Sequence, residues 1–357
     1  SSSSSSLVVD LQDVFRRFSL DTICNISFGL DPCCLQLGRS LSEFAAAFDD
    51  ATRLSARRAL SVLPLVWKVK RLLNLGSERE LRRAIRLVDH LSREVIRQRT
   101  RQTKPPADVH HHQDLLSRFL GSTDDERYLR DIVISFLLAG RDTVASGLTT
   151  FFLLLSNHPD VEAKILEEIT HGTGTAGSSG EEEEEVAVAA SYAQLQGMHY
   201  VHAALYESMR LYPPVQFDSR FAAEDDVLPD GTFVRRGTRL TYHAYAMGRM
   251  EELWGDDCLH FRPERWLDHD GGFVPEEPFR YPVFHAGSRI CLGKELALME
   301  MKSVVVSVVR RFRVDVLRDD AGGGKGLGLP PKFASGLTAS LAGGLPARFT
   351  LRRHPST

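Results

Sequence analysis

Apolar residues recur at helical spacing along most of the chain, and this pattern predicts a mainly helical protein. From residue 7 to about Gly29 the apolar positions share one helix face, and Gly29 with Asp31-Pro32 supplies a stop. The same periodicity predicts further helices over residues 40–60, 77–101, 124–157, 161–170, 198–211 and 291–311. Within residues 77–101 we expect a buried stripe, formed by Leu81, Ile85, Val88, Leu91 and Val95.

After Pro213-Pro214 the pattern changes to short runs typical of strands, bounded by turn signals at residues 228–231 and 236–237. A stretch rich in proline and aromatic residues fills residues 254–284, and a glycine-rich tail with hairpins follows the last helix. The pattern therefore predicts a mainly α fold with a minor β part (α+β).

Three stretches stand apart from this pattern. Ser1 to Ser6 is of low complexity, which predicts disorder. Residues 171–190 combine a Gly/Thr/Ser tract with five successive glutamates, which predicts a flexible loop insertion. His110 to His112 cannot share one helix face, so a solvated loop is favoured over a metal site there.

Composition narrows the class of protein. The 357 residues carry 44 Lys+Arg against 47 Asp+Glu, a net charge of −3, and 43% are hydrophobic. These proportions are typical of soluble globular proteins, and they argue against nucleic-acid binding by phosphate neutralisation. The five cysteines are odd in number and form no CxxC pair, which disfavours a disulfide framework or a structural zinc site.

No signal peptide or anchor is visible where the sequence starts. The most apolar window, residues 132–155, is interrupted by Arg141 and Asp142. Adjacent charges in mid-span are costly in a bilayer, so this window predicts a buried helix.

The strongest chemical signal is FHAGSRICLG, placed where an irregular loop becomes the last predicted helix. Cys291 there can receive backbone N–H groups at the helix start, which stabilise a thiolate. Gly287 and Gly293 make room for a large flat ligand, Phe284 can shield the sulfur, and Arg289 can pair with a carboxylate. These properties suit a thiolate axial ligand to haem iron, with Arg289 on a propionate. The alternative is a buried structural cysteine beside a glycine-rich turn.

A second signal is a candidate ion-pair network. Glu207 and Arg210 are three residues apart on one face of a predicted helix whose neighbours are apolar. Arg265, within FRPERW, could complete a buried network that fixes geometry and does no chemistry. The alternative is an ordinary surface pair of little energetic weight.

The third signal is AGRDT in the middle of the long apolar helix. Small residues at Ala139 and Gly140 let a ligand lie against the backbone, and Thr143 can bend the helix by bonding back to a carbonyl. An acid, Asp142, followed by an alcohol beside a metal could deliver protons to bound dioxygen. The alternative is an ordinary helix with a surface Arg–Asp pair.

Together these motifs, in the order AGRDT, ExxR, PERW and FxxGxRxCxG, resemble the cytochrome P-450 family over essentially the whole chain. The resemblance implies haem b held through Cys291 as the metal ligand, and oxygen activation assisted by Asp142 and Thr143. It also implies a monooxygenase that uses O2 to hydroxylate unactivated C–H bonds. Electrons would come from NADPH through a separate NADPH–cytochrome P-450 reductase.

Further stretches narrow the branch. Residues 18–32, 225–231 and 245–250 resemble plant fatty-acid ω-hydroxylases, and Val144 resembles the sub-branch that oxidises the jasmonoyl-isoleucine conjugate. The expected substrate is thus a small lipophilic carboxylate, a fatty acid or an oxylipin conjugate. The alternatives are a haem-thiolate hydroperoxide isomerase or dehydratase, and an inactive truncated relic. The alcohol of Thr143 favours the monooxygenase over the isomerase.

By analogy with the family, a mostly apolar substrate pocket is lined by Phe136, Leu137, Ala139, Gly140, Val215, Gln216, Phe217, Leu337 and Thr338. Arg220 is either a propionate partner or a plain surface residue. Family members carry a membrane anchor, first sheet strands and first helices ahead of the residues seen here. The resemblance therefore implies one partial domain over residues 7–357, a parent at the cytosolic face of the endoplasmic reticulum membrane, and poor haem binding or turnover by this polypeptide alone.

Overall fold

The computed structural model describes residues 8–36, 43–59, 61, 63–102, 114–173, 190–317, 331–334 and 336–352. The chain forms two compact units, and each is described by itself. The helical unit comprises Asp10–Ser146 and Pro330–Gly344, and the cysteine-loop unit comprises Ser1–Val9, Gly147–Leu329 and Leu345–Thr357. The serine tract, the three adjacent histidines and most of the predicted insertion at 171–190 lie outside the described residues.

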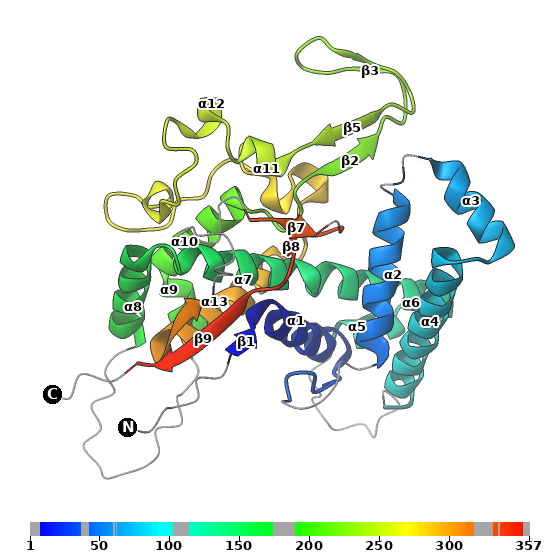
Figure 1. Ribbon diagram of the computed structural model, residues 1–357, viewed down its shortest axis with the longest axis horizontal. Coiled ribbons are helices and arrows are strands. Elements are labelled where there is room, and N and C mark those ends of the chain that lie inside the picture. The colour runs from blue at the N-terminus through cyan, green and yellow to red at the C-terminus, as the bar shows by residue number, and fades with distance from the viewer. Residues whose placement is uncertain are drawn as a thin grey trace. The chain divides into compact units, whose positions relative to one another are not determined.

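The helical unit is built from helices that pack around one apolar cluster (Figure 1). Its elements are α1 (Leu11–Phe28), α2 (Glu43–Ala59), α3 (Pro64–Leu73), α4 (Ser77–Gln102), α5 (Leu115–Leu120), α6 (Glu126–Gly140) and the first turn of α7 (Asp142–Leu155), with β7 (Phe333–Ala334) and β8 (Ser340–Leu341). Phe28, Phe48 and Leu137 lie in the cluster and are at most 3% exposed. Gly29 ends α1 as the sequence predicted, because it adopts a φ of 63° that side chains disfavour.

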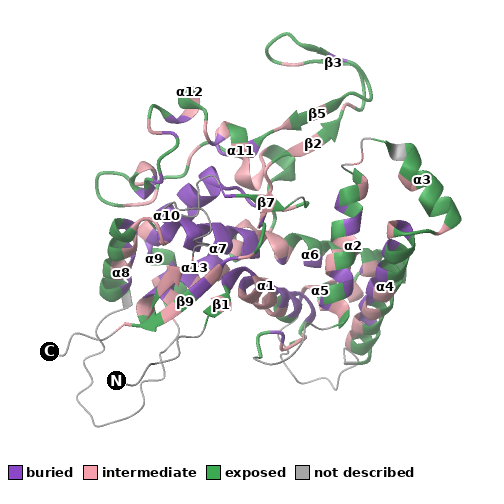
Figure 2. Cartoon of the chain, in the orientation of Figure 1, coloured by how far each residue is buried: buried purple, intermediate pink, exposed green. Residues whose placement is uncertain are grey.

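The cysteine-loop unit combines buried helices with small antiparallel sheets. Its helices are the remainder of α7, α8 (Pro159–Thr173), α9 (Tyr192–Gly197), α10 (His199–Leu211), α11 (Ala244–Met247), α12 (Glu251–Trp254) and α13 (Lys294–Arg311). Figure 2 shows α10 as a buried helix, and its residues from Ala203 to Leu211 are all buried. Burial on every side explains why this helix carries few charges apart from the Glu207–Arg210 pair.

The strands of this unit are short, and they pair both with near neighbours in the chain and with distant segments. They are β1 (Val8–Asp10), β2 (Asp218–Phe221), β3 (Asp226–Val227), β4 (Phe233–Val234), β5 (Arg239–Tyr242), β6 (Phe312–Val316) and β9 (Pro346–Leu351). β2 pairs antiparallel with β5, with Asp218 opposite Tyr242, and β3 pairs with β4. The order β1-β9-β6 forms a three-stranded sheet. The fold is therefore mainly α with a minor β part, as predicted.

Several sequence-based expectations need correction. The helix expected over residues 124–157 breaks at Arg141 into α6 and α7. In α4 the predicted stripe is confirmed at Leu81 and Val88, which are buried, but Ile85 is 43% exposed. Ala84 and Ile96 are buried as well, so the buried face is shifted by about one position from the one predicted. The last helix begins at Lys294, not at Cys291. Helices α3, α5 and α9 were not predicted.

The stretch Glu126–Leu155 is, among the described residues, the helix long and apolar enough to cross a membrane by length and composition. Residues 144–155 within it are all buried, whereas Ser135, Leu138 and Ala139 are exposed. The prediction of a buried helix over residues 132–155 is therefore confirmed for its second half and wrong for its first.

Candidate active site

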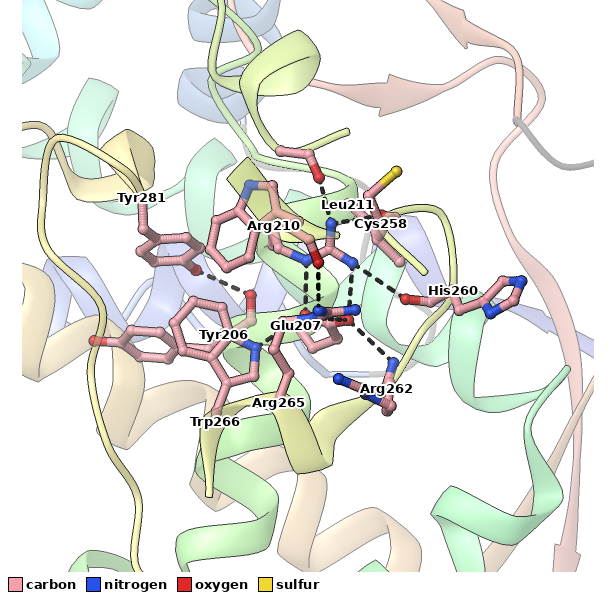
Figure 3. Close-up of polar contacts among 12 residues, drawn as sticks. Tyr206, Glu207, Arg210, Leu211, Cys258, His260, Arg262, Arg265, Trp266 and Tyr281 are labelled. Carbon is pink, nitrogen blue, oxygen red and sulfur yellow. Dashed lines mark hydrogen bonds and ion pairs between the residues drawn. The ribbon is translucent and has the colours of Figure 1, made fainter. Parts of the chain in front are cut away.

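The predicted network of Glu207, Arg210 and Arg265 forms in the cysteine-loop unit (Figure 3). The Arg210 guanidinium makes a two-pronged contact with the Glu207 carboxylate, with Nε–Oε2 at 2.7 Å and Nη2–Oε1 at 2.8 Å. Arg265 Nε lies 3.4 Å from Oε1 of the same carboxylate. The side chains of Glu207 and Arg210 are 0% exposed, so the alternative of a weak surface pair is wrong.

The remaining N–H groups of the Arg210 guanidinium donate to backbone carbonyls of a segment distant in sequence. Arg210 Nη1 donates to the Cys258 carbonyl at 2.6 Å and to the Gly248 carbonyl, and Nη2 donates to the His260 carbonyl at 3.1 Å. Buried charges are tolerated when every donor and acceptor is satisfied. The pair therefore ties the irregular segment 248–266 to α10.

Sequence reasoning missed two donors to Glu207. The Trp266 indole Nε1 donates to Oε2 at 2.9 Å, and the Arg262 backbone N–H donates to Oε1 at 3.0 Å. Trp266 is fully buried. The position of this tryptophan directly after the arginine of PERW was the available signal, because a buried indole needs an acceptor.

The cysteine loop comprises residues 284–293. It follows a short 3-10 turn at Pro282–Phe284, contains a second one at Gly287–Arg289, and leads into α13. His285 and Gly287 both adopt left-handed backbone conformations, with φ of 61° and 66°. The Cys291 N–H donates to the Phe284 carbonyl at 2.8 Å, which closes the loop. Cys291 is half-buried and its thiol is free. The alternative of a fully buried structural cysteine is therefore wrong.

The surroundings of Cys291 fit a large flat ligand bound through sulfur. A Cβ placed on Gly287 or on Gly293 would meet nothing within 4 Å, so open space adjoins the loop at both glycines. Ile290 and Leu292 flank the thiol and are 47% and 94% exposed, which leaves apolar surface beside it. Arg289 is exposed and makes no ion pair with any residue that the structure describes. A cysteine sulfur, open space and an exposed guanidinium match the needs of a haem with carboxylate side groups.

Arg220 lies on β2 and contacts Asp218 on the same strand, with Nη1 2.5 Å from Oδ2. Its side chain is 55% exposed, which supports the surface interpretation. Asp218 in turn lies 3.9 Å from Nδ1 of His285, and the same ring nitrogen is in hydrogen-bond contact with the Tyr242 hydroxyl. A role for Arg220 at a propionate stays a prediction.

The AGRDT motif lies in the helical unit at the break between α6 and α7. Thr143 Oγ1 donates to the Ala139 carbonyl at 2.6 Å, the back-bonding that the sequence predicted. Arg141 is 1% exposed, so the alternative of a surface Arg–Asp pair is wrong. Burial raises the pKa of Asp142, while the nearby guanidinium of Arg141 acts in the opposite direction.

The structure corrects part of the predicted pocket. Leu137 belongs to the apolar cluster of the helical unit, and Phe136 packs against it. Gly140 packs against the Ile23 side chain of α1: a Cβ added at Gly140 would lie only 2.6 Å from Ile23 Cδ1. Helix packing therefore explains Gly140 without a ligand. Ala139 is exposed.

The other predicted pocket residues stay predictions. Val215 and Gln216 are half-buried after the Pro-Pro turn, and Phe217 is 41% exposed. Leu337 is 57% exposed and Thr338 is half-buried, and both lie between β7 and β8 as the predicted hairpin required.

Gly140→Ala is expected to destabilise the chain by about 1–3 kcal/mol, because the added methyl group overpacks against Ile23. Urea unfolding followed by circular dichroism measures the loss. The double variant Ile23→Ala/Gly140→Ala should lose less stability than the sum of the two single variants, because removing the Ile23 side chain relieves the overpacking. A Gly140→Ala variant as stable as the wild type would contradict this packing.

Comparison with known proteins decides the family. A family model described as cytochrome P-450 matches residues 1–326. The chain belongs to the cytochrome P-450 family. It is 55% identical over 95% of its length to cytochrome P-450 94C1 of Arabidopsis thaliana, and 44% identical over 99% of its length to cytochrome P-450 94A1 of Vicia sativa. It is also 44% identical over 96% of its length to cytochrome P-450 94B1 of Arabidopsis thaliana.

These matches confirm the resemblance that the motifs carried, including its plant branch. The chain spans 65% of the length of cytochrome P-450 94C1 and 65% of cytochrome P-450 94A1. Cytochromes P-450 are haem-thiolate proteins with a cysteine axial ligand. Cys291, on its open glycine loop, is the cysteine that fits this role.

Proposed function

We propose that this chain supplies the cysteine loop and the acid–alcohol pair of a haem-thiolate monooxygenase. The observation that carries the proposal is the free, half-buried thiol of Cys291 beside open space at two glycines. The haem would supply oxygen activation through its thiolate-bound iron. Cys291 would hold the iron, and Arg289 would pair with a propionate.

The acid–alcohol pair would handle protons. The Thr143 hydroxyl is held by the Ala139 carbonyl, and Asp142 is a neighbouring carboxyl whose pKa is raised by burial. A carboxyl with a raised pKa can hold a proton closer to neutral pH, which suits proton delivery. Family membership and the presence of this pair favour oxygen chemistry over hydroperoxide rearrangement, for which the alcohol is dispensable.

The proposed substrate is a fatty acid or an oxylipin conjugate such as jasmonoyl-isoleucine, oxidised at its ω-end. The plant relatives of the 94 group and the apolar character of the candidate pocket residues support a lipophilic substrate. The proposed electron donor is NADPH–cytochrome P-450 reductase, and the proposed location is the cytosolic face of the endoplasmic reticulum membrane.

The deciding experiment is a substrate panel on the full-length protein with reductase and NADPH, with products identified by mass. Medium and long fatty acids are compared with jasmonoyl-amino acids. NADPH-dependent gain of one oxygen supports the proposal and names the substrate class. Conversion of fatty-acid hydroperoxides without NADPH would instead show an isomerase or dehydratase, and no haem incorporation would show an inactive protein.

Thr143→Ala is expected to keep haem binding while lowering the product formed per NADPH consumed, by about 10-fold or more, because a proton-delivering hydroxyl is lost. Thr143→Ser retains the hydroxyl and should stay near the wild type. The measurement compares NADPH oxidation with product by mass. Equal coupling in all three proteins would remove the proton-delivery role of Thr143.

A further inference from the structure

The Arg141 guanidinium lies between two carboxylates of the helical unit. Its Nη1 is hydrogen-bonded to Asp49 on α2, 92 residues earlier in the chain. The same nitrogen lies 3.6 Å from Oδ1 of Asp142, the acid of the acid–alcohol pair. Because Arg141 is 1% exposed, its charge needs a buried or half-buried counter-charge. The two carboxylates approach the same nitrogen, Nη1, while Nε has no hydrogen-bond partner among the described residues.

The two carboxylates share the guanidinium unequally. Asp49 takes the direct hydrogen bond, whereas Asp142 is too far from Nη1 for one. The Asp49 side chain is 43% exposed and the Asp142 side chain is 22% exposed. The more solvated carboxylate thus holds the arginine, and the less solvated one next to Thr143 has only a longer contact.

A small cavity, lined mostly by charged residues, adjoins this arrangement. Its volume is about 30 Å³, enough for a water molecule, and its lining residues are Asp13, Arg16, Arg17, Leu20, Cys34, Asp49 and Arg141. Of these, Asp49 on α2 raises the pKa of Asp142 through its charge, whereas Arg16 on α1 and the adjacent Arg141 lower it. The half-exposed Asp49 therefore connects solvent, this cavity and the guanidinium beside Asp142.

We infer that Asp49 is a positioning residue: it engages Arg141 directly, and so prevents Arg141 from closing a direct ion pair with Asp142. A closed pair would hold Asp142 as a carboxylate without its proton. With Arg141 held by Asp49, the Asp142 carboxyl stays available to pass a proton toward Thr143. The kinetic consequence rests on the proposed function, whereas the competition for Arg141 does not.

The competition is tested on the full chain by infrared titration, in which the protonated-carboxyl band that is absent from Asp142→Asn is assigned to Asp142. In Asp49→Asn this band should titrate at lower pH, because Arg141 is free to turn to Asp142 and because the Asp49 charge, which itself raises the pKa of Asp142, is removed. Asp49→Glu restores the carboxylate and should return the titration toward the wild type. If Asp49→Asn is insoluble, Asp49→Ser carries the same expectation.

Asp50→Asn is the matched control, because Asp50 is the next residue on α2, is 56% exposed and pairs with Arg53 on its own helix. It should leave the Asp142 band at the wild-type pH. A band that titrates identically in wild type, Asp49→Asn and Asp49→Ser would overturn the inference. A band displaced equally by Asp50→Asn would show a general charge effect and would overturn it too.

The kinetic arm uses the full-length holoenzyme with reductase. Asp49→Asn should form about two- to tenfold less product per NADPH at neutral pH, with KM unchanged, and its pH profile should follow the infrared titration. An infrared displacement without any product from the wild type would refute the proposed function and leave the inference standing. A coupling profile unchanged in Asp49→Asn, in an active enzyme, would refute the positioning role.

Discussion

Replacing Cys291 by alanine is expected to abolish the thiolate-type spectrum of the reduced, carbon monoxide-bound protein. The physical reason is that the spectrum requires sulfur as the axial ligand, and alanine offers none. The loop itself should persist, because its closing hydrogen bond runs from the backbone N–H of residue 291 to the Phe284 carbonyl. Difference spectra of wild type and variant, loaded with haem under the same conditions, measure the effect.

Cys33→Ala is the matched control for this prediction, because Cys33 is the other half-buried cysteine that the structure describes. Its spectrum should equal that of the wild type. A thiolate-type spectrum that survives in Cys291→Ala would show that the sulfur of another residue binds the iron. The haem content of each protein is measured in parallel, so that loss of haem and loss of the thiolate are told apart.

The parts of the site that the sequence could predict are those set by local geometry. Glu207 and Arg210 meet because residues three apart share a helix face. Thr143 bonds to the carbonyl four residues earlier for the same reason. The cysteine loop was recognisable because a glycine with positive φ and a closing backbone bond need only neighbouring residues. Such features depend little on the rest of the fold.

The parts that could not be predicted depend on partners distant in sequence. Gly140 was assigned to a ligand, but its space is taken by Ile23 of another helix. The alternative interpretation placed Arg141 in a surface pair with Asp142, but Arg141 is buried and hydrogen-bonded to Asp49. The periodic pattern of α4 placed Ile85 in the stripe, although the packing of that helix leaves it 43% exposed. Periodicity identifies an apolar face without identifying what covers its edges.

The second large effect is expected from Glu207→Gln. This change leaves the Arg210 guanidinium, at 0% exposure, without a buried counter-charge. Breaking one side of a buried ion pair typically costs about 3–5 kcal/mol, and the Arg262 N–H and Trp266 Nε1 donors to this side chain also lose a charged acceptor. We therefore expect a large drop in the free energy of unfolding by urea, or failure to accumulate as soluble protein.

The experiment separates charge from packing by comparing three variants. Glu264→Gln is the matched control, because Glu264 is 40% exposed and pairs with Lys164, so its loss should cost at most about 1 kcal/mol. The double variant Glu207→Gln/Arg210→Met removes both charges but also leaves the Gly248, Cys258 and His260 carbonyls without their donor. A smaller loss of stability than in Glu207→Gln alone would show that the unpaired buried charge is the larger cost. If Glu207→Gln proves as stable as Glu264→Gln, the carbonyl oxygens of Gly248, Cys258 and His260 suffice to hold Arg210. The role of the Glu207 carboxylate would then be to orient the segment that follows α10, and the network would not contribute to the free energy of unfolding.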